Sequence, residues 1–218
     1  SSESFVEGSR TAEIDNVIRR LAINKPTFLW GCGGIGKSEI SIKVAEEYQN
    51  CSPKGAYFIH YTVPSNKDHE AMEETVLRMP FSGYKYEPKQ GMSLEEQRKA
   101  EYKARIHILR EHYAGALLVI DNFDWAGKTW EELTAEKSYL EMETIGLNLL
   151  FTTRSEVPGT PEVRELSRED LLRLMRRWVT DLRITDQQLY DLIDAVDGHT
   201  LTVDLIAKCL SRSRRKVT

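Results

Sequence analysis

Apolar positions along the chain fall into two patterns, continuous runs typical of buried strands and three-to-four-residue spacings typical of helices. The runs predict strands at 26–30 (PTFLW), 56–63 (AYFIHYTV), 116–121 (ALLVID) and 148–153 (NLLFTT). Runs without polar alternation are typical of parallel strands that are buried on both faces. The segment 163–166 (VREL) predicts a last short edge strand. Helical spacing precedes the first strand at Ile14, Val17, Ile18 and Leu21, and follows it at Ile40, Val44, Ala45 and Tyr48.

Polar residues that are typical of helix N-caps predict where the longer helices begin. Ser93 with Glu96 forms a capping-box pattern, which predicts a charged helix reaching about His112. The segment 80–92 (PFSGYKYEPKQGM) between strand and helix predicts an exposed loop.

From Ser167 onward the pattern predicts helices alone. Two further caps are expected there, and Gly198 is expected to end the second helix. The cap pairs are Ser167 with Asp170 and Thr185 with Gln188. Strands alternating with helices and then helices alone indicate an α/β protein, a three-layer parallel-sheet domain at 1–166 followed by a small all-α domain at 167–218.

Composition excludes several classes of protein. Among 218 residues, 40% are hydrophobic and 29% charged, and the net charge of −4 does not favour nucleic acid as a partner. No apolar run approaches the roughly 18 residues of a membrane span, and the first ten residues do not resemble a signal peptide. The cysteines lack the spacing of a disulfide framework or zinc site, so a cytoplasmic protein is expected; they are Cys32, Cys51 and Cys209.

The segment 31–38 (GCGGIGKS) carries the strongest chemical signal. It fits the P-loop (Walker A) pattern G-x-x-x-x-G-K-[S/T] and lies between a predicted strand and a predicted helix. Glycines let backbone N–H groups converge on phosphate oxygens, and the helix N-terminus adds its positive dipole. Lys37 is expected to reach the β- and γ-phosphates and Ser38 to ligate Mg²⁺. The predicted phosphate-binding residues are Gly31, Cys32, Gly33, Gly34, Ile35, Gly36, Lys37, Ser38 and Glu39.

Polar residues after two later strands complete the predicted site. Asp121 ends an apolar run, where α/β sheets place ligands, and is expected to hold Mg²⁺. Asn122 follows it and cannot act as a base, so Asp124 is the candidate general base. Arg154 follows the run 148–153 and is a candidate sensor of the γ-phosphate, with Thr152 or Thr153 able to bind the attacking water. The candidate catalytic residues are Lys37, Asp124 and Arg154.

Two other classes of P-loop protein fit the sequence less well. Guanine recognition uses an N-K-x-D element, and neither NKPT at 24–27 nor NKDH at 66–69 matches it, so adenine is favoured. A nucleotide kinase would need an arginine-rich lid. The basic segment 168–178 instead has an amphipathic pattern with an apolar face, which is typical of a core helix.

An ordered series of motifs resembles the STAND class of signalling NTPases, within it the NB-ARC and AP-ATPase branch. The motifs are FVEGSRTAEI, GCGGIGKS, LLVIDNFD, LLFTTRS, VRELSREDLLRL and DGHTLTVDLIA. The resemblance implies adenine contacts by Phe5, Val6 and Arg10. It also implies a nucleotide contact by the turn at Gly198, His199 and Thr200, although Thr200 replaces the proline of the family's G-x-P turn. Asn122 likewise replaces the family's second acidic residue.

The same resemblance implies a function. Such proteins are switches that bind ATP or ADP with Mg²⁺, hydrolyse ATP slowly, and self-associate through neighbouring domains. A winged-helix domain would follow, and the basic segment 211–218 is expected to be a linker or the end of a helix. Two alternatives stay open, an AAA+-type motor acting on nucleic acid or protein, and a binding module without hydrolysis. The motor would need a catalytic Glu beside Asp121.

Overall fold

The computed structural model describes residues 5–214 except 24, 62–69, 82–83 and 126. Its centre is a parallel sheet in the order β1-β4-β3-β2, which places β1 next to β4 and β3 next to β2. The strands are β1 (Thr27–Trp30), β2 (Ala56–His60), β3 (Leu117–Asp121) and β4 (Asn148–Thr153). Because all pairs are parallel, the carboxyl ends of the strands lie along one edge of the sheet.

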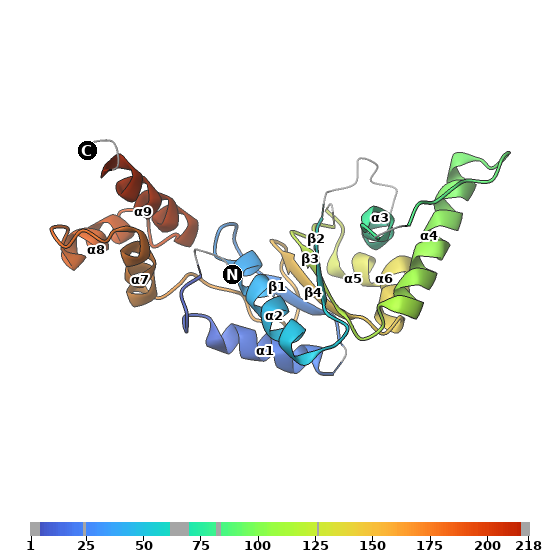
Figure 1. Ribbon diagram of the computed structural model, residues 1–218, viewed down its shortest axis with the longest axis horizontal. Coiled ribbons are helices and arrows are strands. Elements are labelled where there is room, and N and C mark those ends of the chain that lie inside the picture. The colour runs from blue at the N-terminus through green and yellow to red at the C-terminus, as the bar shows by residue number, and fades with distance from the viewer. Residues whose placement is uncertain (1–4, 24, 62–69, 82–83, 126, 215–218) are drawn as a thin grey trace.

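Helices cover both faces of this sheet (Figure 1). One face carries α1 (Thr11–Leu21) and α2 (Lys37–Cys51), and the other carries α3 (Ala71–Arg78), α4 (Leu94–His112), α5 (Trp130–Thr134) and α6 (Lys137–Thr144). A separate hydrophobic core lies on each face of the sheet. In strand β3, Leu117 and Val119 pack into the core beneath α1 and α2, whereas Leu118 and Ile120 pack into the core beneath α3 to α6. The predicted three-layer α/β architecture is confirmed.

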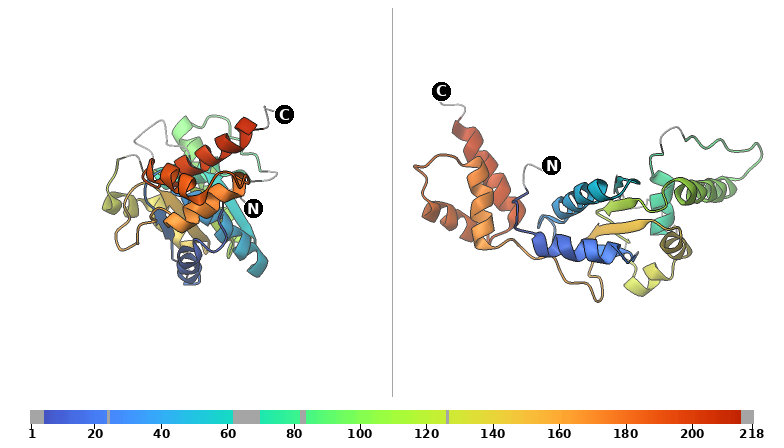
Figure 2. Two further views of the ribbon diagram at one scale, coloured as in Figure 1. Left: turned by 90° about the vertical axis from the view of Figure 1, so that its left-hand side faces the viewer. Right: turned by 60° about the horizontal axis from the view of Figure 1, so that its bottom comes forward.

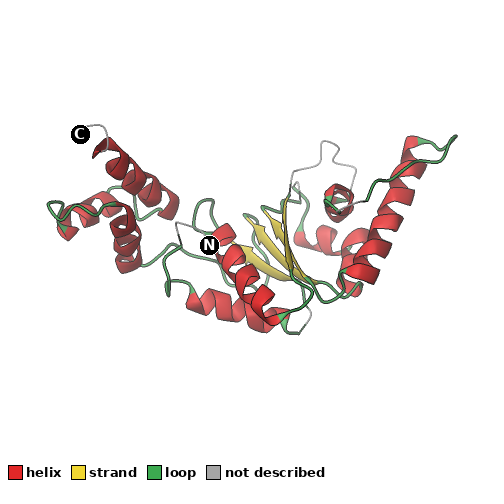
Figure 3. Cartoon of the chain, in the orientation of Figure 1, coloured by secondary structure: helices red, strands yellow, loops and turns green. Residues whose placement is uncertain are grey.

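The last three helices form a separate unit with its own core. They are α7 (Arg168–Trp178), α8 (Asp186–Asp194) and α9 (Thr200–Arg214). Their shared core contains Leu171, Leu174, Met175, Leu189, Ile193, Val203 and Ala207, and Val6 from the N-terminal segment joins it. The unit stands beyond one end of the sheet domain, as the right-hand view of Figure 2 shows, and contains no strand among the described residues (Figure 3). We call it the helical unit.

The N-terminal segment 5–10 connects the two parts. Phe5 lies in the core beneath α1 and α2, whereas the neighbouring Val6 lies in the core of the helical unit. Arg177 of α7 donates a hydrogen bond to the Phe5 carbonyl, and Arg173 donates one of 2.7 Å to the Glu7 carbonyl. Segment 5–10 therefore holds the helical unit against the sheet domain.

The predicted caps are confirmed. Ser93 and Glu96 form a complete capping box at α4, as do Thr185 and Gln188 at α8, and Ser167 caps α7. The described part of segment 80–92 contains no helix or strand and is largely exposed, as expected. Among the described residues, no helix combines the length and the apolar character needed to cross a membrane.

Two expectations about secondary structure are wrong. Residues 163–166 form no strand; one isolated bridge lies just before them, between Glu162 and Trp30. Pro161 has no N–H to donate to a neighbouring strand. Strand β1 also ends before Gly31, where the chain turns away, so residues 163–166 have no strand beside them to pair with. The second helix of the helical unit ends at Asp194, and Gly198 instead closes the following turn, with its N–H bonded to the Ile193 carbonyl at 3.0 Å. Residues 62–63 of the predicted second strand and the NKDH segment at 66–69 lie outside the described residues.

Candidate functional site

The glycine-rich loop 31–36 leaves β1 at the carboxyl edge of the sheet and leads directly into α2. Gly31 has a φ of +147°, and a Cβ there would lie 2.6 Å from the Val163 carbonyl oxygen. Gly34 has a φ of +79°, and a Cβ there would lie 2.8 Å from the Cβ of Leu201. A side chain at either position would collide with its neighbours, so these glycines allow the loop to pass between the sheet domain and the helical unit.

The loop is held from within the protein. Ile35 is 2% exposed and anchors the loop in the core beneath α1 and α2. Arg10, itself buried, donates a 2.8 Å hydrogen bond to the Ile35 carbonyl. The N-cap of α2 is Gly36, which has no side chain to accept the first N–H groups of the helix. Those donors, with the positive end of the helix dipole, form a site suited to an anion.

Lys37 lies across this loop. Its Nζ donates hydrogen bonds to the carbonyl oxygens of Gly31 at 2.8 Å and Cys32 at 2.6 Å. Burial lowers the pKa of Lys37, and the positive charge of Arg154 lowers it further. A polyphosphate bound in the loop would favour the charged lysine, because opposite charges nearby stabilise ionised groups.

Asp121 and Ser38 meet at the same edge of the sheet. Oδ1 of Asp121 accepts hydrogen bonds from the Ser38 hydroxyl at 2.7 Å and the Thr152 hydroxyl at 2.6 Å. Oδ2 lies 3.2 Å from Nδ1 of His60, at the end of β2. The Thr152 hydroxyl also accepts the Asn122 N–H at 2.8 Å, and that of Thr153 accepts the Ser155 N–H at 3.1 Å. Thr152 and Thr153 were the candidates for binding the attacking water, and both hydroxyls already make hydrogen bonds within the protein.

Arg154 extends from the end of β4 over the loop. Its Cζ lies 3.5 Å from the position that a Cβ on Gly33 would occupy. The guanidinium is therefore close to the backbone N–H groups that are expected to bind phosphate. A side chain that senses the terminal phosphate would have to lie there. The position of Arg154 agrees with the predicted role without testing it.

Asn122 and Asp124, the two residues considered for activating the attacking water, differ in their position relative to the cavity. Asn122 lines the cavity and has a left-handed backbone with a φ of +59°, which asparagine tolerates better than most residues. Asp124 is exposed and does not line the cavity, because the fully buried Phe123 separates it from Asn122. Burial raises the pKa of Tyr61, and the negative charge of Asp124 raises it further.

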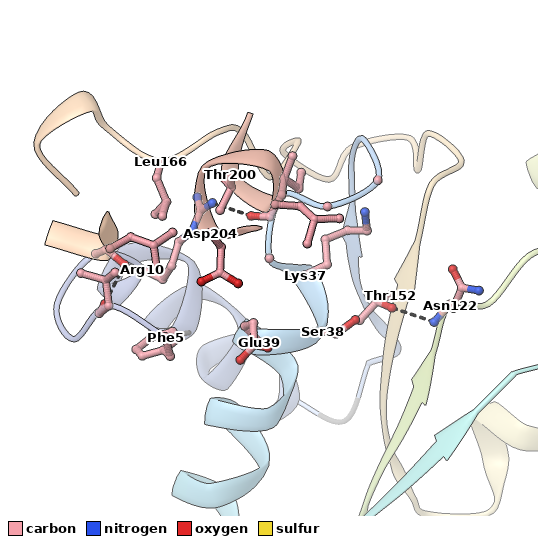
Figure 4. A pocket seen from close by; sticks show the side chains of 18 of the residues that line it. Phe5, Arg10, Lys37, Ser38, Glu39, Asn122, Thr152, Leu166, Thr200 and Asp204 are labelled. Atoms are coloured by element: carbon pink, nitrogen blue, oxygen red, sulfur yellow. Dashed lines mark hydrogen bonds between the residues drawn. The ribbon is translucent and has the colours of Figure 1, made fainter. Parts of the chain in front are cut away.

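A cavity of about 410 Å³ lies between the loop, segment 5–10 and the helical unit (Figure 4). Most of the predicted binding residues line it, namely Phe5, Val6, Arg10, Gly33, Gly34, Ile35, Gly36, Lys37, Ser38, Glu39, Arg154 and Thr200. Seven predicted site residues do not line it, namely Gly31, Cys32, Asp121, Asp124, Thr153, Gly198 and His199. Gly31, Cys32 and Asp121 act behind the cavity wall, through their contacts with Lys37 and Ser38.

The turn before α9 closes against the loop. Nε2 of His199 lies 3.0 Å from the Gly33 carbonyl oxygen, and Nδ1 lies 2.8 Å from the Thr202 hydroxyl. The N–H of Thr200 donates a 3.0 Å hydrogen bond to Glu165. His199 thus contacts the loop itself, whereas Thr200 reaches the cavity.

Sequence reasoning missed several residues that line the cavity. They are Ser9, Leu166, Leu174, Leu201, Asp204 and Lys208. Asp204 and Lys208 had a detectable signal, because they are four residues apart and stand within the apolar run of α9. Charged residues in such a run need a polar environment, which a ligand cavity provides.

Comparison with known proteins gives structural likeness only. No protein-family model matches the chain, and a search of curated proteins found no match. Among solved structures, it resembles Hsp104 in a closed-state reconstruction with ATPγS and FITC casein (TM-score 0.57, 17% identity, 95% of this chain and 38% of that chain). It also resembles the Saccharomyces cerevisiae Hsp104–ADP complex (TM-score 0.58, 20% identity, 97% and 32%).

A third similar structure is a Walker-type ATPase of Pyrococcus abyssi, with a TM-score of 0.58, 14% identity, and coverage of 91% of this chain and 66% of that chain. The chain thus spans about a third of the length of the Hsp104 chains. The likeness establishes the fold, which is that of the P-loop NTPases.

Proposed function

We propose that the chain binds ATP and ADP with Mg²⁺ in the cavity between its two parts and acts as the nucleotide switch of a STAND-type signalling protein. One observation carries the proposal: loop residues 33–36, Ser38 and Arg154 line a single cavity, and Asp121 is bonded to Ser38 behind its wall. Each group suits a part of a nucleoside triphosphate, since backbone N–H groups bind phosphate and a cation meets its terminal charge.

The residues present also fit a magnesium ion. A carboxylate and a hydroxyl, on Asp121 and Ser38, supply the oxygen ligands that Mg²⁺ prefers. No cluster of three or more His, Cys, Asp or Glu side chains suited to a metal occurs in the described part of the chain. This agrees with a cation held by one or two side chains, phosphate oxygens and water. When held by Ser38 and Asp121, Mg²⁺ would offset the negative charge of the phosphates.

The position of the cavity supports the proposed switch role. Residues of the sheet domain, of segment 5–10 and of the helical unit all line it. A nucleotide that contacts both parts favours the arrangement in which those contacts are made, and a change from ATP to ADP alters the contact at Arg154. Such differential affinity is what shifts a conformational equilibrium. Contacts made by neighbouring domains would then control self-association.

Slow hydrolysis is part of the proposal. The Asn122 amide cannot accept a proton, and an AAA+-type motor would need a glutamate there. Asp124, which is exposed next to the buried Phe123, stays our candidate general base. Asp124→Asn should slow ATP turnover about 10²- to 10⁴-fold, the range for removing a general base. Unchanged turnover would exclude Asp124 from this role.

The proposal is tested by competition against a fluorescent ADP analogue, followed by turnover assays. ADP should displace the analogue at least tenfold more effectively than GDP, which corresponds to about 1.4 kcal/mol. ATP turnover should be slow and should require Mg²⁺. Equal competition by GDP would contradict adenine preference, and absence of any binding would contradict the function as a whole. Fast turnover stimulated by protein or nucleic acid would favour the motor instead.

A further inference from the structure

The peptide between Gly33 and Gly34 lies where the glycine-rich loop meets the helical unit. Glycine on both sides lets such a peptide rotate at little steric cost, so its orientation depends on contacts from outside the loop. Gly34 has a left-handed φ of +79°. A Cβ on Gly34 would lie 2.8 Å from the Cβ of Leu201 and 2.9 Å from Cε1 of His199. The start of α9 therefore packs directly against this peptide.

His199 holds one side of the peptide. Its Nε2 lies 3.0 Å from the Gly33 carbonyl oxygen. A carbonyl oxygen only accepts hydrogen bonds, so Nε2 carries the proton and donates it. Nδ1 lies 2.8 Å from the Thr202 hydroxyl, which can donate to it and so favours this tautomer of the ring. The imidazole is thus engaged at both nitrogens.

The other side of the peptide is available to a ligand. In a trans peptide the C=O and N–H groups point in opposite directions, and no described peptide bond is cis. The Gly34 N–H therefore points away from His199, and it donates to no described residue. Gly34 lines the cavity whereas His199 does not. This N–H is a donor suited to a phosphate oxygen.

The turn that carries His199 is itself attached to the sheet domain. Glu165, in the segment after β4, accepts hydrogen bonds from both the N–H and the hydroxyl of Thr200. The His199 carbonyl accepts the Val203 N–H at 3.0 Å, as expected for the residue that precedes α9. These backbone contacts on either side hold the imidazole at a defined place relative to the loop.

We infer that His199 is a positioning residue, which holds the Gly33 carbonyl and so turns the Gly34 N–H toward the phosphate of a bound nucleotide. The inference rests on the proposed function. It gives His199 a role other than the direct nucleotide contact that the family resemblance implies. Because His199 belongs to the helical unit, the loop is held in its binding orientation only while that unit lies against it.

A ligand that contacts the loop alone separates this role from a purely structural one. Pyrophosphate has the charged part of ADP but no base or ribose with which to reach the helical unit. A variant that only loosened the helical unit would weaken ADP binding and leave pyrophosphate binding unchanged. Loss of the His199 donor would weaken binding of both ligands by a similar factor.

The experiment is titration with pyrophosphate and with ADP, both with Mg²⁺, read by calorimetry and by the Gly34 amide resonance in NMR spectra. His199→Ala removes the donor, and it should bind both ligands about three- to tenfold more weakly, the effect of losing one hydrogen bond that favours the competent orientation. His199→Gln keeps an amide N–H near the position of Nε2 and should stay within about twofold of wild type. The matched control is His107→Ala, on the exposed surface of α4, which should bind normally.

Unchanged pyrophosphate affinity in His199→Ala would overturn the inference while leaving the proposed function intact. A loss in His199→Gln as large as that in His199→Ala would overturn it as well. If His199→Ala fails to fold, the wild type decides, because pyrophosphate should shift the Gly34 amide resonance and the absence of a shift at saturation would contradict the inference. Failure of wild-type protein to bind either ligand would overturn the proposed function together with the inference.

Discussion

The Ser38 hydroxyl donates a 2.7 Å hydrogen bond to Oδ1 of Asp121, joining residues 83 positions apart in the sequence. The pair brings the start of α2 to the end of β3, beside the loop that begins after β1. Ser38 and Asp121 are the residues that would hold a magnesium ion, and the Ser38 oxygen could ligate it while its proton is still donated to Asp121. Asp121 is thus expected to couple affinity to Mg²⁺ more than to the nucleotide itself.

Asp121→Asn should keep nucleotide binding while reducing its dependence on Mg²⁺. Backbone N–H groups of the loop hold phosphate without the metal, whereas the neutral amide attracts the cation poorly. ADP affinity measured with Mg²⁺ and with EDTA should differ clearly in the wild type and much less in the variant. A variant that keeps the full difference would show that Asp121 does not act on the metal.

Lys37→Ala should remove ATP binding and leave the fold intact. The ammonium is expected to make two or more charge-assisted hydrogen bonds to phosphate, each worth about 1.5–3 kcal/mol, so affinity should fall more than about 100-fold. Calorimetric titration gives the affinity, and circular dichroism checks the fold. Lys43→Ala, on the surface of the same helix with Glu7 as partner, is the control and should bind normally. Normal ATP affinity in Lys37→Ala would remove this lysine from the site.

Arg154→Ala should weaken ATP binding about tenfold or more, the effect of losing one hydrogen bond to a charged group, and should change ADP affinity little. The reason is that a group above Gly33 reaches a terminal phosphate, which ADP lacks. Competition of both nucleotides against a fluorescent analogue measures the ratio. Arg110→Ala, in the last turn of the distant α4, should leave that ratio unchanged. Equal loss of ATP and ADP would show that Arg154 does not distinguish them.

Thr152→Val should lower the free energy of unfolding by about 1–3 kcal/mol, because it leaves buried polar groups without a partner. Thr152 is 1% exposed. Its hydroxyl donates a hydrogen bond to Asp121 and accepts one from the Asn122 N–H. Urea denaturation measures the change. Thr144→Val removes an exposed hydroxyl at the end of α6 and should stay within about 0.5 kcal/mol of wild type. A loss no larger than that control would show that the link contributes little.

The sheet was predictable because its strands are continuous apolar runs, and the range 148–153 agrees fully with β4. The short helices were not recognised. α3 and α5 contain only eight and five residues, too few for apolar spacing to stand out. The capping box of Thr129 and Glu132 at α5 was a usable signal, the same one that located α4.

The phosphate end of the site was predictable because its motif is contiguous and its chemistry depends on residue type. The other end is assembled from residues that are distant in sequence. Asp204 enters the cavity only because α9 folds back onto α7, with its carboxylate bonded to Trp178. Arg10 illustrates the same limit. Predicted as a base contact, it lines the cavity but donates its hydrogen bonds to Ile35 and Glu13.

The central claim is that one nucleotide contacts both the loop and the helical unit. Amide hydrogen exchange with and without ADP and Mg²⁺, read by mass spectrometry on short peptides, tests this most directly. The account predicts that ADP slows exchange both at 31–40 and at 200–208, with Lys37→Ala abolishing both effects. Unchanged exchange at 31–40, or protection there without any at 200–208, would contradict a nucleotide site shared by the two parts.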